Sequence, residues 1–232
     1  MRCDSSLGPP GRRMGETWLR QPVMPMVEAQ TTQRPRHPAR PRLMCVLTAD
    51  DPLTWMPQRI TVAGGSGTGK TTLCNRIAEL MGYPRVEIDS LHHGPEWTRR
   101  ESFVADVERF ISGPQWVIEL QYQEVQPLIL ERADTLFWLD YPTSVQMARL
   151  VRRTLSRRLL RQELWNGNEE PPLRTFFTDE DHIIRWGWRT RNKLKRVIPT
   201  LDDRCPSFTT VRLSHPREAR RCLRALDEGT RR

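Results

Sequence analysis

The sequence predicts an α/β protein in which a parallel β-sheet is covered by helices on both faces. The chain has 232 residues, enough for one domain with a hydrophobic core. From Gln58 onward, short apolar runs alternate with longer amphipathic segments, which is typical of repeated strand–helix units. A glycine-rich stretch, GGSGTGKT at 64–71, separates the first apolar run from the first amphipathic segment. Ligands of such sheets bind beyond the carboxyl ends of the strands, so we expect the functional residues there.

Five strands are predicted from apolar runs of four to six residues, at 60–63, 85–88, 116–119, 135–140 and 208–213. Helices are predicted from amphipathic segments at 70–81, 100–111, 125–132, 143–164, 179–198 and 216–227. Several boundaries have their own signals. Thr143 and Asp179 are suited to cap a helix, and Pro216 suits a first helical position. Gly82 is suited to end the helix that starts near Lys70.

Residues 1–56 differ from the rest of the chain. This segment is rich in arginine and is interrupted by prolines, which break any periodic element. We expect a disordered, dispensable extension, followed by one domain over 57–232. Three other interpretations stay open: a basic arm that contacts nucleic acid, a mitochondrial transit peptide, and Met56 as the true start of the protein.

The composition limits the class of protein. The formal net charge is +9, and almost all of the positive charge is arginine, since lysine occurs only at Lys70, Lys193 and Lys195. Such a charge can attract nucleic acid, an anionic membrane or an anionic substrate, but most of these arginines are expected to be solvated. No apolar run approaches the ~20 residues of a membrane span. Five scattered cysteines without a C-x-x-C pair argue against a disulfide framework and favour the cytoplasm.

The glycine-rich stretch fits the phosphate-binding pattern G-x-x-x-x-G-K-[ST] from Gly64 to Thr71. Glycine lets backbone N–H groups approach a polyphosphate closely, and the following helix adds its N-terminal dipole. Lys70 is predicted to reach the β- and γ-phosphates, and the Thr71 hydroxyl to coordinate Mg²⁺. The ATP-binding residues are therefore predicted to be Gly64, Gly65, Ser66, Gly67, Thr68, Gly69, Lys70, Thr71 and Thr72.

Other segments indicate which kind of nucleotide-binding protein this is. The Asn-Lys-x-Asp motif of GTPases is absent, because Asn192-Lys193 lies in a predicted helix without the aspartate. Asp89 follows the second predicted strand, where it is suited to hold an acceptor hydroxyl, act as a base or bind a Mg²⁺-bound water. The alternative for Asp89 is a helix or turn cap. Glu119 ends the third strand and is the predicted metal carboxylate, although Asp140 at the end of the fourth strand competes with it.

An arginine-rich segment follows Thr143, with arginines at 149, 152, 153, 157, 158 and 161. Arginines that close over a transferring phosphoryl group stabilise its charge, and Arg153 and Arg157 share a helix face because they lie four residues apart. We expect about half of the set to be solvated. The loop at 165–172 is interpreted as a hinge of a mobile lid. Trp186 and Trp188 are expected to pack in the interior or between helices.

The adjacent histidines His92 and His93 resemble a metal pair. They have no cysteine, histidine or carboxylate at the spacing of a closed site, so metal binding is not favoured. Because the pair follows Asp89 closely, contact with the acceptor substrate is the preferred interpretation.

Taken together, four segments resemble the adenylate-kinase-like P-loop proteins, and most closely the group labelled topology modulation protein. They are IDSLHHGPEW at 88–97, WVIE at 116–119, ERAD at 131–134 and LWNGN at 164–168. The resemblance covers about residues 58–228. It implies a three-layer P-loop fold with strand order 2-3-1-4-5, an acceptor-binding insertion at about 89–112 and an arginine-bearing lid at about 157–182. Arg153, Arg157 and Arg158 match the arginine spacing at the base of that lid.

The sequence departs from adenylate kinases around the acceptor site. Their Asp-Gly-x-Pro-Arg run after the third strand is replaced by Glu119-Leu120-Gln121-Tyr122, and their AMP loop is replaced by Asp89-Ser90-Leu91. These departures favour a hydroxyl acceptor over AMP, while Arg99 and Arg100 keep a phosphate acceptor open.

The sequence thus predicts an ATP- and Mg²⁺-dependent phosphotransferase that acts on a nucleotide, nucleoside or other small acceptor. Its predicted catalytic residues are Lys70, Asp89, Arg153 and Arg157, and its predicted metal ligands are Thr71 and Glu119. The alternative is a regulatory ATPase that binds nucleic acid through its basic surface.

Overall fold

The structure is a computed structural model of the chain, and it describes residues 46–51, 55–160, 163–168, 182–204 and 209–231. Most of the predicted N-terminal extension therefore lies outside the described residues. The same holds for residues 161–162 and 169–181, which include much of the predicted lid. Within the described part, no helix has the length and apolar character needed to cross a membrane.

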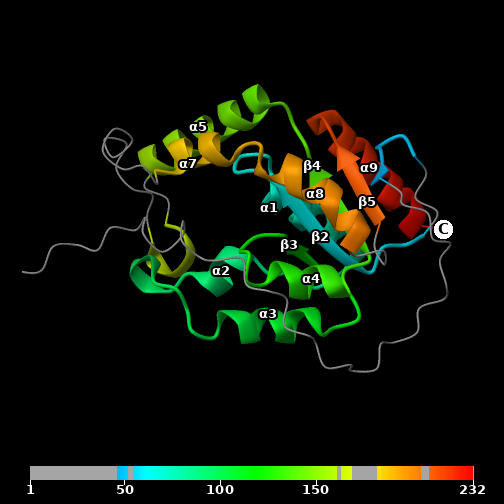
Figure 1. The fold of residues 1–232 in the computed structure, drawn as a ribbon, viewed down its shortest axis with the longest axis horizontal. Helices are drawn as coiled ribbons and strands as arrows, with labels where there is room; N and C mark the ends of the chain where they lie inside the picture. Colours follow the sequence, from blue (N-terminus) through cyan, green and yellow to red (C-terminus); the bar gives the residue numbers. More distant parts are fainter. Residues whose placement is uncertain (1–45, 52–54, 161–162, 169–181, 205–208, 232) are drawn as a thin grey trace, which may run out of the picture.

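A five-stranded sheet forms the centre of the fold, and every strand pair in it is parallel. Its strands are β1 (Val46–Leu47), β2 (Arg59–Gly64), β3 (Trp116–Glu119), β4 (Thr135–Leu139) and β5 (Thr209–Leu213), in the order β1-β5-β4-β2-β3 (Figure 1). Val62 is in register with Glu119, and Gly64 is in register with Leu139. The carboxyl ends of β2, β3 and β4 therefore meet at one edge, as the α/β prediction requires.

The predicted strand order 2-3-1-4-5 is wrong at both edges of the sheet. The segment predicted as the second strand, 85–88, contributes only one isolated bridge, from Arg85 to Val117. Ser90 donates hydrogen bonds from its backbone N–H and its hydroxyl to the Glu87 carbonyl, which draws the chain into a helical turn from Ile88 onward. The opposite edge is occupied by β1, which comes from the segment predicted to be a disordered extension.

Helices surround the sheet: α1 (Lys70–Met81), α2 (Ile88–His92), α3 (Phe103–Ile111), α4 (Gln126–Arg132), α5 (Thr143–Leu159), α7 (Ile183–Thr190), α8 (Lys193–Arg204) and α9 (Pro216–Thr230). Two short 3₁₀ turns, η1 (Pro95–Trp97) and η2 (Trp165–Gly167), lie beyond α2 and α5. Two separate hydrophobic clusters show that both faces of the sheet are covered. One contains residues of α3, α4 and α8, and the other contains residues of α1 and α9 (Figure 1).

Two predicted helices differ from the structure. The helix predicted over 143–164 ends at Leu159, and the helix predicted over 179–198 is two helices, α7 and α8. Arg191 explains the break between α7 and α8. Its side chain folds back over the Trp188 ring at 4.0 Å and donates a hydrogen bond to the Trp188 carbonyl, which satisfies an acceptor at the end of α7.

The residues before β2 are part of the fold. Leu47, Ala49 and Met56 pack against the cluster that contains α1 and α9, and the Trp55 indole donates a 3.1 Å hydrogen bond to the Thr135 hydroxyl. We therefore expect a chain of residues 56–232 to be less stable than one of residues 46–232, by about 2 kcal/mol for the lost apolar burial. Thermal unfolding of the two chains measures the difference. Equal melting temperatures would restore the interpretation that everything up to residue 56 is dispensable.

Candidate functional site

The glycine-rich loop connects β2 to α1 at the carboxyl edge of the sheet. Gly67 and Gly69 have φ angles of 85° and 95°, in the left-handed region that favours glycine. Thr68 folds the loop on itself, because its N–H and its hydroxyl both donate to the Gly65 carbonyl, at 3.3 and 2.8 Å. Gly69 caps α1 without any side-chain hydrogen bond. The N–H groups of the first helical turn are thus left for an anion, as phosphate loops require.

At Gly67 the loop has no space for a side chain, because α5 packs against it. A Cβ atom added to Gly67 would lie 2.6 Å from the Gln146 carbonyl oxygen and 2.9 Å from Leu150 Cβ. Arg149 binds the loop from the same helix, since its guanidinium donates a 3.2 Å hydrogen bond to the Thr68 carbonyl. Sequence reasoning missed Gln146, Arg149 and Leu150 as loop contacts. Their spacing indicates a common helix face but does not indicate what that face meets.

The other predicted nucleotide-binding residues lie in and just beyond this loop. Ser66 is half-buried, and its Cβ lies 3.8 Å from the position that a Cβ atom added to Gly187 of α7 would occupy. Lys70 is only 8% exposed, and its ammonium group lies 3.5 Å from the Gly65 carbonyl oxygen. Thr71 is half-buried and Thr72 is exposed in the first turn of α1. A buried lysine curled against its own loop is well placed to meet phosphate oxygens there.

Glu119 and Asp89 are brought together by one amide side chain. Gln121 donates hydrogen bonds of 3.1 Å to Glu119 Oε2 and of 3.1 Å to Asp89 Oδ1. Burial raises the pKa of Glu119, while the charge of Lys70 and a hydrogen bond from the Thr71 side chain oppose this effect. Lys70, Thr71, Glu119 and Asp89 thus form one constellation at the carboxyl ends of β2 and β3. From the sequence alone, Gln121 was notable only as part of the segment that replaces the Asp-Gly-x-Pro-Arg run of adenylate kinases.

Asp140, the alternative candidate for the metal carboxylate, is bound by residues outside this constellation. Arg212 of β5 binds Asp140 Oδ2 through two nitrogens, at 2.9 and 2.5 Å, and the Lys195 ammonium of α8 lies 3.5 Å from Oδ1. The Arg212 guanidinium also lies over the Trp138 ring at 5.2 Å. Both carboxylate oxygens therefore have cationic partners that tie β4 to β5 and α8, so Asp140 acts as a structural ion-pair partner.

Asp89 is neither a helix cap nor a turn cap. It lies in the first turn of α2, whose N-cap is Glu87 and has no side-chain capping bond. Its Oδ1 accepts a 2.6 Å hydrogen bond from the Tyr122 hydroxyl in addition to the bond from Gln121. The Tyr122 oxygen also lies 3.0 Å from His93 Nε2. The structure thus surrounds Asp89 with polar groups of the insertion and of the turn after β3.

The two histidines differ in environment. His92 is buried and stacks on the Tyr122 ring, with centroids 3.9 Å apart and planes 9° apart. Burial lowers the pKa of His92 to about 4, so its ring is neutral at pH 7. Burial also lowers the pKa of His93, against an opposing effect of Asp89. Within the described residues, no group of three His, Cys, Asp or Glu side chains is arranged for a metal ion.

The arginines of the insertion are engaged in ion pairs. Arg99 binds Glu124 at 2.6 Å, and Arg100 binds Asp106 at 3.2 Å. Arg85, just before the insertion, lies 3.0 Å from Glu87. Glu124 neutralises Arg99, whereas Asp106 is shared between Arg100 and Arg109, which lies 2.9 Å from it. Both Arg99 and Arg100 therefore already have carboxylate partners, which disfavours their use in binding a phosphate group of an acceptor.

The predicted arginines of α5 lie along the helix that runs from the loop toward the insertion. Arg157 lies 6.0 Å from the Trp165 ring. Burial acts to raise the pKa of Glu87, but hydrogen bonds from Trp165 and Arg85 and the charges of Arg85 and Arg157 lower it overall. Arg153 is half-buried one turn nearer the loop. Figure 1 shows α5 and α7 side by side, and Gly187 of α7 packs against Leu150.

The segment predicted as a lid hinge is docked where it is described. Asn168 is 5% exposed; its amide donates to the Gly94 carbonyl at 3.0 Å, and its oxygen accepts from the Trp97 N–H at 2.9 Å. Asn166 donates to the His93 carbonyl, and the Trp165 indole donates to Glu87 at 2.5 Å. Residues 165–168 are therefore fixed on η1 and α2. The lid itself falls largely on residues outside the described part of the chain.

Two tryptophans of α7 depart from the prediction. Trp186 and Trp188 were expected to pack in the interior or between helices, but their side chains are 39% and 54% exposed. The intervening Gly187 is buried against α5 instead, because a Cβ there would lie 2.5 Å from Leu150 Cδ2. The close approach of α7 to α5 turns the flanking tryptophans outward.

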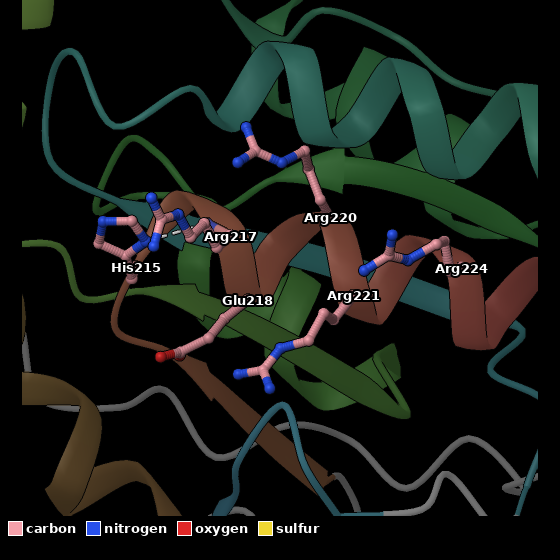
Figure 2. Close-up of a pocket in the computed structure, with 6 residues that line it drawn as sticks. All are labelled: His215, Arg217, Glu218, Arg220, Arg221 and Arg224. Carbon is pink, nitrogen blue, oxygen red and sulfur yellow. Dashed lines mark hydrogen bonds between the residues drawn. The ribbon is translucent and has the colours of Figure 1, made fainter.

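An arginine-rich region lies along the first turns of α9, away from Asp89 and Glu119. Figure 2 shows its residues, His215, Arg217, Glu218, Arg220, Arg221 and Arg224, around a shallow hollow. Arg221 is paired with Asp50 at 2.7 Å, and Glu218 accepts a hydrogen bond from the Ser214 N–H. The side chains of Arg217, Arg220 and Arg224 form no ion pair with any residue that the structure describes.

No protein-family model matches the chain, and no curated protein matches it. The chain is similar in fold to solved structures of low sequence identity. A gluconokinase from Sinorhizobium meliloti is 19% identical, with a TM-score of 0.44, over 76% of this chain and 95% of that one. A shikimate kinase from Bacteroides thetaiotaomicron is 16% identical, with a TM-score of 0.42, over 76% of this chain and 99% of that one. The resemblance to the topology modulation group stays a prediction.

The tight packing of the loop gives a matched pair of glycine substitutions. Gly67→Ala and Gly82→Ala both place a side chain at positive φ, which costs about 1–2 kcal/mol. Only Gly67→Ala also meets backbone, because no atom lies within 4 Å of a Cβ at Gly82. We expect Gly67→Ala to weaken nucleotide binding at least about tenfold, ~1.4 kcal/mol, and Gly82→Ala to leave it unchanged. Titration calorimetry with ATP measures both, and equal affinities would exclude the loop as the phosphate site.

Proposed function

We propose that this protein is a phosphotransferase that moves the γ-phosphoryl group of Mg-ATP to a hydroxyl of a small acceptor. One observation carries the proposal: two carboxylates, Asp89 and Glu119, are joined by Gln121 beside Lys70 and Thr71. A phosphate-binding loop alone holds a nucleotide. A second carboxylate next to it, at the end of the neighbouring strand, offers a group for the acceptor as well.

The residues present fit a magnesium ion. Mg²⁺ prefers oxygen ligands and keeps several of its waters, so a carboxylate and a hydroxyl beside the phosphates are sufficient protein ligands. Glu119 and Thr71 supply this donor set, and the Thr71 side chain already hydrogen-bonds the buried Glu119 carboxylate. When bound, Mg²⁺ would neutralise charge on the phosphate oxygens.

The proposed transfer divides the work among four groups. The acceptor oxygen forms a bond to the γ-phosphorus as the bond from that phosphorus to the β–γ bridging oxygen breaks, and ADP leaves. Asp89 takes the hydroxyl proton. Lys70, together with Arg153 and Arg157 of α5, is proposed to stabilise the charge on the transferring group. Glu119 and Thr71 would hold the metal.

The acceptor is proposed to be a hydroxyl compound without a phosphate at the recognition end. Recognition of a phosphate is favoured by cations that are not already bound by carboxylates of the protein. Arg99 and Arg100, the cations that kept this option open, are paired with Glu124 and Asp106. Nucleosides and neutral hydroxyl metabolites therefore fit better than nucleoside monophosphates.

The test is ADP release by the full chain with Mg-ATP, across nucleoside monophosphates, nucleosides and small hydroxyl metabolites. We expect one class of hydroxyl compound to stimulate turnover. Lys70→Ala should abolish that turnover, and Asp89→Asn should lower kcat by about 10²–10⁴, the usual contribution of a general base. If no acceptor stimulates ADP release, the phosphotransferase proposal is wrong.

A matched pair of isosteric changes tests the metal assignment within the same assay. Glu119→Gln should raise the Mg²⁺ concentration needed for half-maximal turnover, because it removes the charged ligand. Asp140→Asn should leave that concentration unchanged, since Asp140 is bound by Arg212 and Lys195. The reverse result would assign the metal to Asp140.

A regulatory ATPase that binds nucleic acid is the second candidate, favoured by the arginines of α9. Arg217, Arg220 and Arg224 are spaced three and four residues apart, so they form a stripe along one face of the helix (Figure 2). Phosphate contacts of this kind make the logarithm of affinity fall linearly with the logarithm of salt concentration. Binding of single- and double-stranded DNA at increasing salt, in the wild type and in Arg220→Ala with Arg224→Ala, measures this. ATP turnover that DNA stimulates would favour this candidate.

A further inference from the structure

Tyr122 has an unusual backbone conformation. It lies three residues beyond the end of β3, and its φ angle is 56°, in the left-handed region that large side chains rarely adopt. Its carbonyl accepts hydrogen bonds from the Val125 and Gln126 N–H groups, at 3.1 and 3.2 Å, and so leads the chain into α4. Strained conformations of this kind persist where the surrounding structure holds them, and they cluster at functional sites.

The Tyr122 ring is held on three sides. His92 stacks on one face at 3.9 Å, and Phe103 meets the ring edge-on at 5.3 Å. His93 meets the hydroxyl at 3.0 Å. The ring therefore has one orientation, with the hydroxyl directed at Asp89.

The hydroxyl has one proton, and chemistry assigns its direction. Asp89 Oδ1 lies 2.6 Å away and can only accept, so Tyr122 donates to it. The contact with His93 Nε2 is then satisfied when that nitrogen carries a proton and donates to the Tyr122 oxygen. Gln121 donates to the same Oδ1 at 3.1 Å. Among the described residues, none forms a hydrogen bond with Asp89 Oδ2.

We propose that Tyr122 is the positioning residue for Asp89: with Gln121 it holds Oδ1 on the protein side and leaves Oδ2 for the acceptor hydroxyl. The inference rests on the proposed function, because it assumes that Asp89 serves the acceptor. In this arrangement Oδ2 takes the hydroxyl proton. Tyr122 keeps its proton and donates its hydrogen bond to Oδ1 throughout, and it does not touch the reacting atoms.

A purely packing role for Tyr122 makes a different prediction. The stacking on His92 and the contact with Phe103 depend on the ring, which phenylalanine retains. Tyr122→Phe therefore removes the hydroxyl's contacts with Asp89 and His93 and leaves the packing in place. Tyr83→Phe is the matched control, because the Tyr83 hydroxyl donates a 3.1 Å hydrogen bond to the Pro57 carbonyl outside the site.

The experiment is a double-mutant cycle on the full chain with the acceptor found in the ADP assay. We expect Tyr122→Phe to lower kcat about tenfold, with the KM for ATP nearly unchanged, and Tyr83→Phe to change neither. In the Asp89→Asn background, Tyr122→Phe should have little further effect, because its effect acts through Asp89. Additive effects, or an unchanged kcat in Tyr122→Phe, would overturn the proposal.

A second readout does not depend on turnover. The ¹³C carboxyl signal of Asp89 responds to the hydrogen bonds that the carboxylate accepts, so at one fixed pH it should move in Tyr122→Phe and stay in place in Tyr83→Phe. Asp89→Asn identifies the signal. An unmoved signal in Tyr122→Phe would overturn the positioning role. If Asp89→Asn leaves kcat unchanged while the signal moves, the assignment of Asp89 to the acceptor fails instead.

Discussion

The contact between Gly67 and the first turns of α5 is the constraint on which the rest of the site depends. The loop can wrap an anion only if its backbone approaches α5 without a side chain between them, and the left-handed φ angle of Gly67 makes that approach geometrically accessible. Arg149 then binds the loop carbonyl at Thr68, which makes α5 part of the loop's support. Because Arg153 and Arg157 belong to α5, the same contact also fixes where these two arginines lie relative to the loop.

Electrostatic balance is the second constraint. Two neighbouring carboxylates, Asp89 and Glu119, lie at one sheet edge, and burial disfavours the charged form of Glu119. Lys70 offsets part of this effect, and Gln121 donates one amide hydrogen to each carboxylate. The same polar groups would be costly in an ordinary core, where buried polar atoms need partners. Their presence together at the strand ends is the property that distinguishes a site from a merely packed edge.

The sequence predicted the features that depend on local pattern. The parallel sheet, the loop between β2 and α1, and the approximate extent of α1 and α9 follow from periodicity and from glycine and proline chemistry. The features it did not predict depend on contacts between distant residues. Nothing in the sequence Val46-Leu47 indicates that it pairs with β5. The run at 85–88 has strand-like composition, but it forms only one bridge, at Arg85, before the helical turn that starts at Ile88. Tyr122 and Gln121 look like ordinary turn residues until the fold brings Asp89 beside them.

The hydrogen bonds of Asn168 have a consequence for changing the specificity of this fold. Asn168 binds Gly94 and Trp97, so two segments about seventy residues apart in the chain share one small interface. Trp97 and Trp165 meet across it, with ring centroids 6.4 Å apart. A recombinant protein that receives the 93–97 loop from a relative will lose this interface unless it receives the 163–168 turn as well. The two segments form one structural unit, and any exchange of the proposed acceptor region has to treat them together.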